Sequence, residues 1–375
     1  MEDNVAPFRP QGATATAGLD QWVRRRWPFL LVGALAVVAT SYGLFRYAMS
    51  APRDAESQGL VAPTSTDMLS ADGLADRALD GVRVKPEDAR LLPFAVMIES
   101  HPDARPLSGL SKASVVFAAP VEGGITRYMA VFDASSTADK IGPVRSARPY
   151  YIEWARALNA VYAHVGGSPE AMNRLAGLLD FRNLDEISNG KYFWRDSKRQ
   201  APHNAFTSSN LLLAAARDKK WKAGAFTPWL FDDVASGTTP GDQRDIRIPY
   251  GGSYDVRWSY DPQTDMYDRW LAGKAHRDAD GSAVRARNVL VLQTEDKVLD
   301  EEGRLYVRTA GEGKAWLFRN GYRDDIKWTR QANEFIKLMT GDGRPVVLGR
   351  GVTWVEVITD EKTAPSVSSA ATGTR

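Results

Sequence analysis

Two arginines precede a predicted helix in the segment IGPVRSARPYYIEWARAL. Arg145 and Arg148 lie in the turn before this helix, and Pro149 falls in its first turn. A cation at a helix N-terminus opposes the helix dipole, at a cost of about 0.3–1 kcal/mol. Two arginines at this position therefore indicate a bound anion. It is either a carboxylate of this chain, such as Glu122 or Asp133, or an anionic group of a ligand.

A third arginine, Arg127, lies on the predicted hairpin EGGITRYMAVF. Strand alternation places its side chain on the same face as apolar neighbours. A guanidinium on such a face needs a partner, because burying an unpaired charge is costly. Glu122, across the Gly-Gly turn, is the partner that the chain itself offers. The alternative is an anionic ligand shared with the two arginines before the helix.

The segment AVYAHVGGSPEAMNRLAGLL predicts a buried strand that carries His164 and ends at Gly166 and Gly167. Ser168 is a suitable N-cap for the helix that follows, and Pro169 suits its first position. Backbone N–H groups at such a junction form an anion site at the carboxyl edge of a sheet. An ordinary capped turn is the alternative. The segment is not a Walker loop, a dinucleotide fingerprint or a Gly-x-Ser-x-Gly elbow.

The polar loop WRDSKRQAPHN contributes Arg195, Asp196, His203 and Asn204. It is long enough to cover the edge of a sheet as a binding loop, although a solvated charged face is the alternative. Ser168, His203 and Asp196 have the residue types of a catalytic triad, but sequence spacing gives them no geometry.

Metal ions, cofactors and nucleic acid are not predicted ligands. The four histidines form no His-x-x-x-His or His-Glu-x-x-His pair, so a metal site would have to be assembled from distant residues. The absence of cysteine excludes thiolate nucleophiles, cysteine-ligated zinc and a lipidated N-terminal cysteine. With 48 basic against 46 acidic residues and a formal net charge of +2, the chain lacks the charge excess of a nucleic-acid binder.

The N-terminal part predicts a single transmembrane anchor over residues 27–47. The nineteen residues between Arg26 and Arg46 carry no charge and would span about 28 Å as a helix. The arginine triplet ending at Arg26 places residues 1–26 in the cytoplasm and the body outside. Residues 48–90, rich in Ala, Ser, Asp and Pro, are predicted as a tether. A cleaved signal peptide is the alternative to a retained anchor.

Residues 91–235 predict a layered α/β domain with a mixed sheet. Strand-like runs such as PFAVMIES, ASVVFAAPVE, TRYMAVF and AVYAHV alternate with helical patterns near residues 150–158, 169–179 and 210–219. Interleaved strands and helices are typical of this class. The domain is expected to end in the loop at 234–243.

Residues 244–360 predict a second domain that is all-β, a small barrel or sandwich. Its runs are short, aromatic and β-branched, and Asp-Gly and Asn-Gly turns separate them. Aromatic residues at alternating strand positions are more often core than a sugar-binding surface. These aromatic residues are Trp258, Tyr260, Tyr267, Trp270, Trp316, Phe318, Trp328 and Trp354. Residues 361–375, rich in Ser, Thr and Ala, are predicted as a disordered tail.

Long phrases of the chain resemble the YerB-like family of bacterial membrane-anchored proteins. They cover about 91–358 and include AVMIES, HPDARPLSGLSKASVVFAAPVEGGITRYMAVF, IGPVRSARPYY, HVGGSP, RDSKRQAPHNAFTS, YDPQTDMYDRWLAGKAHRDADG and GRGVTWVEVI. The resemblance implies an extracytoplasmic body made of two consecutive domains of unknown function, with no catalytic role to transfer. Members are often lipoproteins, whereas this chain has no cysteine to lipidate, so a transmembrane helix is expected to replace the lipid.

Together these patterns predict a non-enzymatic envelope protein that binds an anionic ligand or a protein partner. The ligand bears phosphate or carboxylate and binds in an arginine-rich cleft of the α/β domain. The predicted binding residues are Arg127, Arg145, Arg148, His164, Gly166, Gly167, Ser168, Arg195, Asp196, His203 and Asn204. One alternative is an envelope transferase or hydrolase acting on a phosphorylated lipid or glycan, with a histidine or Asp196 as acid or base. The other is a structural module in which the arginines form internal salt bridges.

Overall fold

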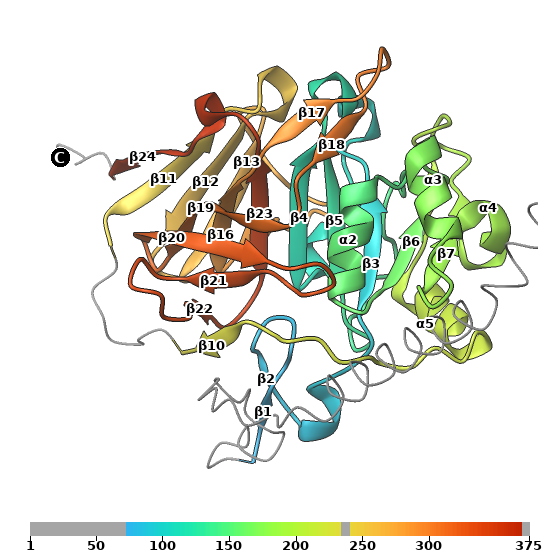
Figure 1. Cartoon of the computed structure of the whole chain (residues 1–375), viewed down its shortest axis with the longest axis horizontal. Coiled ribbons are helices and arrows are strands. Elements are labelled where there is room, and N and C mark those ends of the chain that lie inside the picture. Colours follow the sequence, from blue (N-terminus) through green and yellow to red (C-terminus); the bar gives the residue numbers. More distant parts are fainter. Residues whose placement is uncertain (1–72, 234–240, 370–375) are drawn as a thin grey trace, which may run out of the picture. The chain divides into compact units, whose positions relative to one another are not determined.

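The structure is a computed structural model that describes residues 73–233 and 241–369. A ten-stranded mixed sheet forms the centre of the protein (Figure 1). Its strand order is β21-β20-β19-β16-β23-β4-β5-β3-β6-β7. The bounds of these strands are Phe94–Ile98 (β3), Val115–Pro120 (β4), Thr126–Phe132 (β5), Val161–His164 (β6), Asn183–Asp185 (β7), Asn288–Gln293 (β16), Gly311–Arg319 (β19), Tyr322–Arg330 (β20), Lys337–Met339 (β21) and Thr353–Ile358 (β23).

Both predicted domains contribute to this one sheet. Strands β3 to β7 come from the predicted α/β segment, and the others come from the predicted all-β segment. They join where β23 pairs in parallel with β4, from Thr353 opposite Val115 to Glu356 opposite Ala118. The second segment is all-β, as predicted, but one of its sheets continues into the first segment. Every residue of β23 is buried, so this strand needs a neighbour on each side and cannot lie at an edge.

A second, six-stranded antiparallel sheet covers one face of the large sheet. Apolar side chains from both sheets and from helix α5 form one core cluster, to which β12 contributes Trp258 and Tyr260. The strand pattern of β12 alternates between buried and half-buried residues, as expected for a strand covered on one face. The elements of this layer are β11 (Gln243–Ile248), β12 (Val256–Asp261), β13 (Met266–Leu271), β14 (Lys274–Ala275), β15 (Arg285–Ala286), β24 (Ser366–Ser369) and α5 (Ser209–Asp218).

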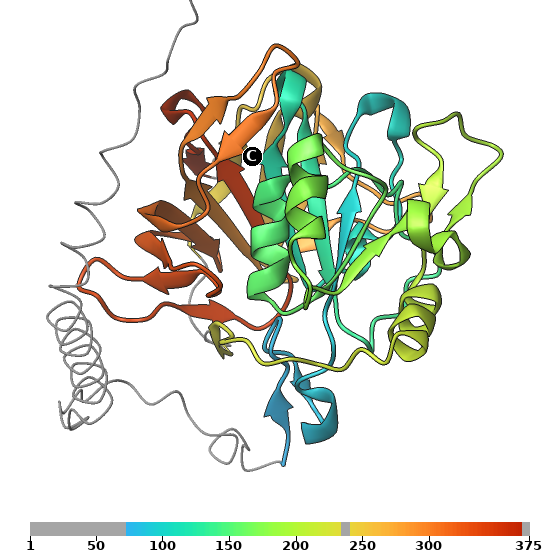
Figure 2. The ribbon, with the colours of Figure 1, turned by 45° about the vertical axis from the view of Figure 1, so that its right-hand side comes forward.

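Helices α2 (Pro149–Ala157) and α3 (Pro169–Ala176) cover the opposite face of the large sheet, where Figure 2 shows them side by side. Val115 and Phe117 of β4 pack on this side, while Val116 and Ala118 pack on the other. The three predicted helices are confirmed, with ends that differ by at most three residues. The short helix α4 (Glu186–Asn189) was not predicted.

Two segments expected to be extended or disordered are ordered where the structure describes them. Residues 73–90, assigned to the tether, contain the paired strands β1 (Ala75–Asp76) and β2 (Arg83–Val84). Buried Asp80 accepts a hydrogen bond from Ser114 Oγ at 2.7 Å and so ties this ribbon to the body. Residues 361–369, assigned to the tail, include β24, which pairs with β11. In both cases backbone pairing, which composition does not reveal, provides the order.

The remaining strands form small two-stranded sheets at the periphery. They are β8 (Trp194–Arg195) with β9 (Ala205–Phe206), β10 (Leu230–Asp232) with β22 (Val347–Gly349), and β17 (Asp296–Val298) with β18 (Leu305–Val307).

No helix within the described ranges is both long and apolar enough to cross a membrane. The predicted anchor at 27–47 and the cytoplasmic segment at 1–26 lie outside those ranges. The first part of the tether, residues 234–240 of the boundary loop and residues 370–375 lie outside them as well.

Candidate functional site

The loop before α2 places its arginines at the carboxyl ends of β3 and β6. Arg145 N–H donates to the carbonyl of Met97 at 3.0 Å, and the carbonyl of Arg145 accepts from Val165 N–H at 3.1 Å. The loop therefore lies between these two strand ends and is fixed by backbone hydrogen bonds. In open α/β sheets this edge is where ligands bind.

Glu99, which follows β3, joins the loop arginine to the polar loop at 194–204. Its Oε2 lies 2.7 Å from Arg145 Nε and 2.9 Å from His203 Nδ1. The carboxylate is buried, so its charge depends on these two partners. Arg145 and His203, predicted to share a site, therefore contact the same oxygen of Glu99.

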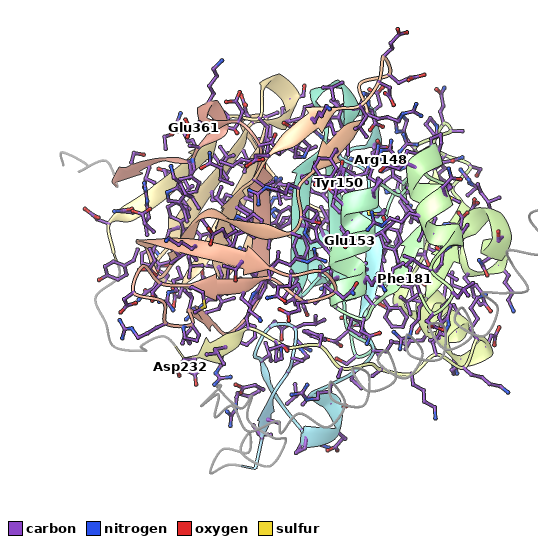
Figure 3. The ribbon with its side chains drawn as sticks, viewed as in Figure 1. Arg148, Tyr150, Glu153, Phe181, Asp232 and Glu361 are labelled. Atoms are coloured by element: carbon purple, nitrogen blue, oxygen red, sulfur yellow. The ribbon has the colours of Figure 1, made fainter. Side chains whose placement is uncertain are left out.

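Glu122, at the tip of the β4–β5 hairpin, pairs with the other two arginines. Arg148 donates to both carboxylate oxygens, with its Nε 2.9 Å from Oε2, and Arg127 Nη2 lies 3.8 Å from Oε1. Burial alone would raise the pKa of Glu122, but its hydrogen bonds to Arg148 and the nearby positive charges lower this pKa to about 2. The internal partner considered for these arginines is therefore present. Figure 3 shows Arg148 at the N-terminal end of α2.

Arg127, Arg145 and Arg148 are called the arginine array below. They differ in how many of their N–H groups have a hydrogen-bond partner. Buried Arg127 also donates from Nη1 to the carbonyl of Ser146 at 3.1 Å, and Arg148 donates from Nη1 to its neighbour's carbonyl. Burial, followed by the charge of Arg148, lowers the pKa of Arg127. Arg145, 22% exposed, forms an ion pair with Glu99, in which its Nε lies 2.7 Å from Oε2 without hydrogen-bond geometry. The array thus places three guanidinium groups against two carboxylates.

The predicted glycine turn has the contacts of a capped structural turn. Gly166 N–H donates to Asp185 Oδ1 at 2.8 Å, and Ser168 Oγ accepts from the first turn of α3 at 3.3 Å. His164 is fully buried, with Nδ1 2.7 Å from the carbonyl of Gly166 and Nε2 2.7 Å from Asn183 Oδ1. Gly167 pairs with the arginine loop through a backbone bridge to Ala147. These contacts position the loop, and binding of an anion by the turn itself remains a prediction.

The polar loop is held by its own ion pairs. Arg195 Nη2 lies 3.0 Å from Glu186 Oε1, and its Nη1 donates to Asn204 Oδ1 at 3.1 Å. Asp196 accepts from Lys140 Nζ at 2.7 Å. Arg195, Asp196 and Asn204 therefore make contacts away from the arginine array, while His203 reaches it through Glu99.

Ser168, Asp196 and His203, the residues of the conceivable catalytic triad, are not paired with one another. Ser168 Oγ caps α3, Asp196 pairs with Lys140, and the carboxylate beside His203 is Glu99. A histidine paired with a buried carboxylate is nevertheless suited to proton transfer, because the carboxylate fixes the ring.

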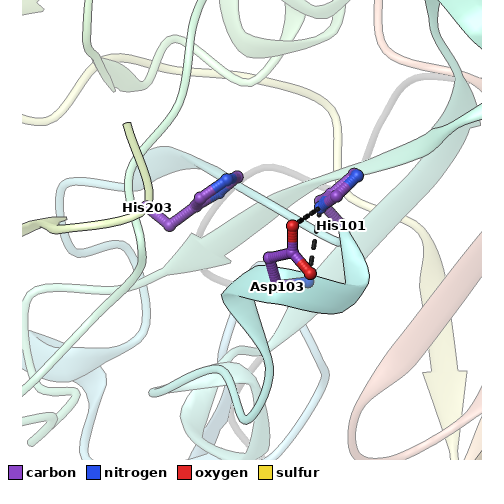
Figure 4. A group of neighbouring side chains, drawn as sticks. All are labelled: His101, Asp103 and His203. Atoms are coloured by element: carbon purple, nitrogen blue, oxygen red, sulfur yellow. Dashed lines mark hydrogen bonds and ion pairs between the residues drawn. The ribbon is translucent and has the colours of Figure 1, made fainter. Parts of the chain in front are cut away.

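A second group of side chains, not predicted from the sequence, lies beside His203. His101 stacks on His203, with ring centroids 5.4 Å apart and an angle of 15° between the planes (Figure 4). Asp103 lies next to His101, and one potential ligand atom from each of the three residues lies within 4.8 Å of the others. The available signal was the phrase ESHPD, which places Glu99, His101 and Asp103 directly after a predicted strand.

A pocket outlined by the structure lies elsewhere, between α2 and the strands of the C-terminal segment, and includes no member of the arginine array. Its lining residues are Trp154, Leu292, Thr294, Arg308, Thr309, Trp328, Ile336 and Val357. The expected arginine-rich cleft therefore remains a prediction.

Comparison with known proteins defines the family. Residues 79–222 match the "Protein of unknown function (DUF3048) N-terminal domain", and residues 246–355 match the corresponding C-terminal domain. The chain belongs to this family of proteins with two tandem domains, and the YerB-like resemblance is confirmed.

Two relatives illustrate the similarity. The chain is 31% identical over 287 residues to a Bacillus subtilis protein named "Putative lipoprotein YerB", covering 75% of this chain and 86% of that protein. The crystal structure of YerB from Bacillus subtilis matches with a TM-score of 0.70 and 30% identity, covering 78% of this chain and 98% of that one. The fold described here is therefore that of the family.

Proposed function

We propose that this protein is a membrane-anchored, extracytoplasmic component of the bacterial envelope. Its similarity to a protein named as a lipoprotein supports this location. The chain has no cysteine for a lipid, and its uncharged segment within 27–47 follows an arginine triplet. A single transmembrane helix with a cytoplasmic N-terminus replaces the lipid anchor in this proposal.

The proposed activity of the exported body is the non-enzymatic binding of an anionic ligand or partner at the arginine array. The observation that carries this proposal is Arg145, which is partly exposed and whose guanidinium forms an ion pair with Glu99 without hydrogen-bond geometry. Its two Nη groups can donate to a phosphate or carboxylate in the planar geometry that guanidinium groups favour. The excess of arginines over carboxylates in the array favours an incoming anion as well.

Ligand binding by Arg145 can be tested with the full chain purified in detergent. Thermal unfolding would be followed with inorganic phosphate, a polyprenyl phosphate, an anionic wall glycopolymer and nucleotides. We expect at least one anion to raise the Tm, and Arg145→Gln to bind it about tenfold to a hundredfold more weakly, as the loss of a charged hydrogen bond implies. Arg156→Gln removes an exposed arginine from α2 outside the array and serves as the matched control.

Two results would contradict the binding proposal. The first is that no anion in the panel raises the Tm. The second is that Arg145→Gln and Arg156→Gln bind the stabilising anion equally well, which would leave the array as an internal salt-bridge network.

A second candidate function, an envelope transferase or hydrolase, is favoured by the Glu99–His203 pair. A carboxylate only accepts hydrogen bonds, so Nδ1 of His203 carries the hydrogen and Nε2 is free to act as a base. Arg145 beside it could stabilise charge that develops on a phosphorylated substrate. Turnover of a phosphorylated lipid or glycan that is lost in His203→Gln, with binding retained, would establish this function in place of simple binding.

A further inference from the structure

Three potential metal ligands converge beside the arginine array, from segments about one hundred positions apart. His101 and Asp103 belong to the turn after β3, and His203 belongs to the polar loop (Figure 4). They offer two imidazole nitrogens and one carboxylate oxygen. Zn²⁺ is commonly bound by this donor set, whereas Ca²⁺ and Mg²⁺ prefer oxygen donors.

Glu99 supports His203 in the way that carboxylates support metal-binding histidines. Its buried Oε2 lies 2.9 Å from His203 Nδ1, so Nδ1 is the protonated nitrogen and the lone pair is on Nε2. Such an outer carboxylate fixes the tautomer and the ring orientation and makes the imidazole a better ligand. Because Arg145 also pairs with this oxygen, Glu99 itself is held in place.

One ion can bind both histidines only after His101 turns out of its stacked position on His203, because a metal ion lies in the plane of each imidazole that binds it and the two ring planes are only 15° apart. This turn also breaks the 3.3 Å hydrogen bond that His101 Nδ1 accepts from Asp103 N–H. His101 is 35% exposed, which leaves room for the movement. Two ligands of one zinc ion, each about 2.0–2.2 Å from the metal, lie at most about 4.4 Å apart. His101 Nδ1 lies 3.6 Å from Asp103 Oδ2, and the whole group falls within 4.8 Å. Asp103 is 74% exposed, so its side chain can turn toward the ion at little cost. The same exposure gives an ion access from solvent.

We infer that His101, Asp103 and His203 form a binding site for a divalent transition-metal ion, with Zn²⁺ as the representative ion. Three protein ligands leave a fourth position for water or for an anion, as in zinc sites that bind substrates. This inference goes beyond the anion-binding proposal and stands without it, because the ion needs no other ligand to bind. If both hold, Glu99 Oε2 links the metal-binding His203 to Arg145.

The test uses the full chain and Zn²⁺ alone, in a buffer free of phosphate, with equilibrium dialysis and metal analysis. We expect one Zn²⁺ per chain. His101→Ala and Asp103→Asn should each weaken binding at least tenfold, since loss of even an outer partner costs about 10–100-fold. Asp139→Asn removes a different exposed carboxylate and should bind as the wild type does.

Co²⁺ gives a second readout that does not depend on stability. Its visible absorption reports the ligand set, so the wild-type spectrum should be lost in His101→Ala and in His203→Ala while thermal unfolding confirms that each variant is folded. Zn²⁺ binding of the same strength in His101→Ala and Asp103→Asn as in the wild type would overturn the site. Failure of the wild type to bind one Zn²⁺ would overturn it as well.

Discussion

Glu99 and Glu122 hold the site together because each carboxylate is shared by two hydrogen-bond donors or cations. Glu99 pairs with Arg145 and His203, and Glu122 bridges the other two arginines of the array. Sharing reduces the number of buried acids needed to balance buried cations. It also means that one substitution affects two partners at once, so effects of neighbouring variants will not be additive.

The pH dependence of stability should report the Glu122 pairing. The pKa of Glu122 is lowered from its ordinary value of 4.5 to about 2, so the folded state binds its proton less readily than the unfolded state. The resulting stabilisation, up to about 3 kcal/mol, is present above pH 4.5 and is lost as the pH falls toward 2. In Glu122→Gln this part of the pH dependence should vanish, as measured by urea unfolding between pH 6 and 3.

Glu295→Gln is the matched control for this measurement. Glu295 is 78% exposed and pairs with Arg308 at 3.3 Å, so its contribution is that of a surface ion pair. Its stability profile should follow that of the wild type. Parallel profiles for Glu122→Gln and the wild type would contradict the structural role of Glu122.

Among single residues, side-chain pairs that lie close together in the sequence were easier to predict than pairs that lie far apart in it. Glu122 was one of two partners considered for Arg127, because both lie on one hairpin, and this pair is present. The Glu99–His203 contact joins residues 104 positions apart, and only the packing of the polar loop against the end of β3 creates it. A motif search cannot find such a pair, and for the same reason His101 was not recognised as a neighbour of His203.

Strands β13 and β23 connect the two sheets through one buried ion pair. Arg269 Nη2 lies 3.3 Å from Glu356 Oε1, and the two side chains are 1% and 0% exposed. Arg269 also packs 4.5 Å from the ring of Trp354 and donates to the hydroxyl of Tyr128 at 3.2 Å. Burial, opposed by the charge of Arg269, raises the pKa of Glu356. The interface between the layers is therefore specified by polar contacts as well as by apolar packing.

Replacing Arg269 by methionine should be strongly destabilising. The variant keeps most of the side-chain volume but leaves Glu356 buried without its cation, which costs about 3–5 kcal/mol. Urea unfolding of the full chain at neutral pH measures this loss. Replacing Arg285 by methionine breaks the neighbouring pair with Asp268, whose side chains are 41% and 34% exposed, and should cost no more than about 1 kcal/mol. Equal losses in the two variants would contradict the role assigned to burial.

Element types were predictable because local patterns determine them. The helix with Ser168 as its N-cap and the turn at Asn320-Gly321 both occur where the sequence indicated. Partners of the strands were not predictable, since a fully apolar strand such as β23 shows that it is buried but not which strands flank it. That the two predicted domains share one sheet was therefore not predictable from the sequence.

The whole body depends on the parallel junction between β23 and β4. The registers are continuous over four residue pairs, and the strands on either side of the junction come from different halves of the chain. Further contacts tie the N-terminal ribbon to the C-terminal half, including Arg350 with Asp76 and Gly351 N–H with the carbonyl of Asp80. Tandem sequence domains therefore form one structural unit over the described residues.

It follows that neither half should fold alone. Residues 1–235, expressed separately, would expose β4 as an apolar edge, and residues 236–375 would expose β23 in the same way. We expect both fragments to aggregate or to lack cooperative urea unfolding, whereas co-expression should yield a soluble complex that unfolds in one transition. The full chain cut only in the loop at 234–240 is the control for the break in the backbone. Cooperative unfolding of either fragment by itself would show that the shared sheet is a contact between independent domains, because a domain with its own sufficient core does not need a strand from its neighbour.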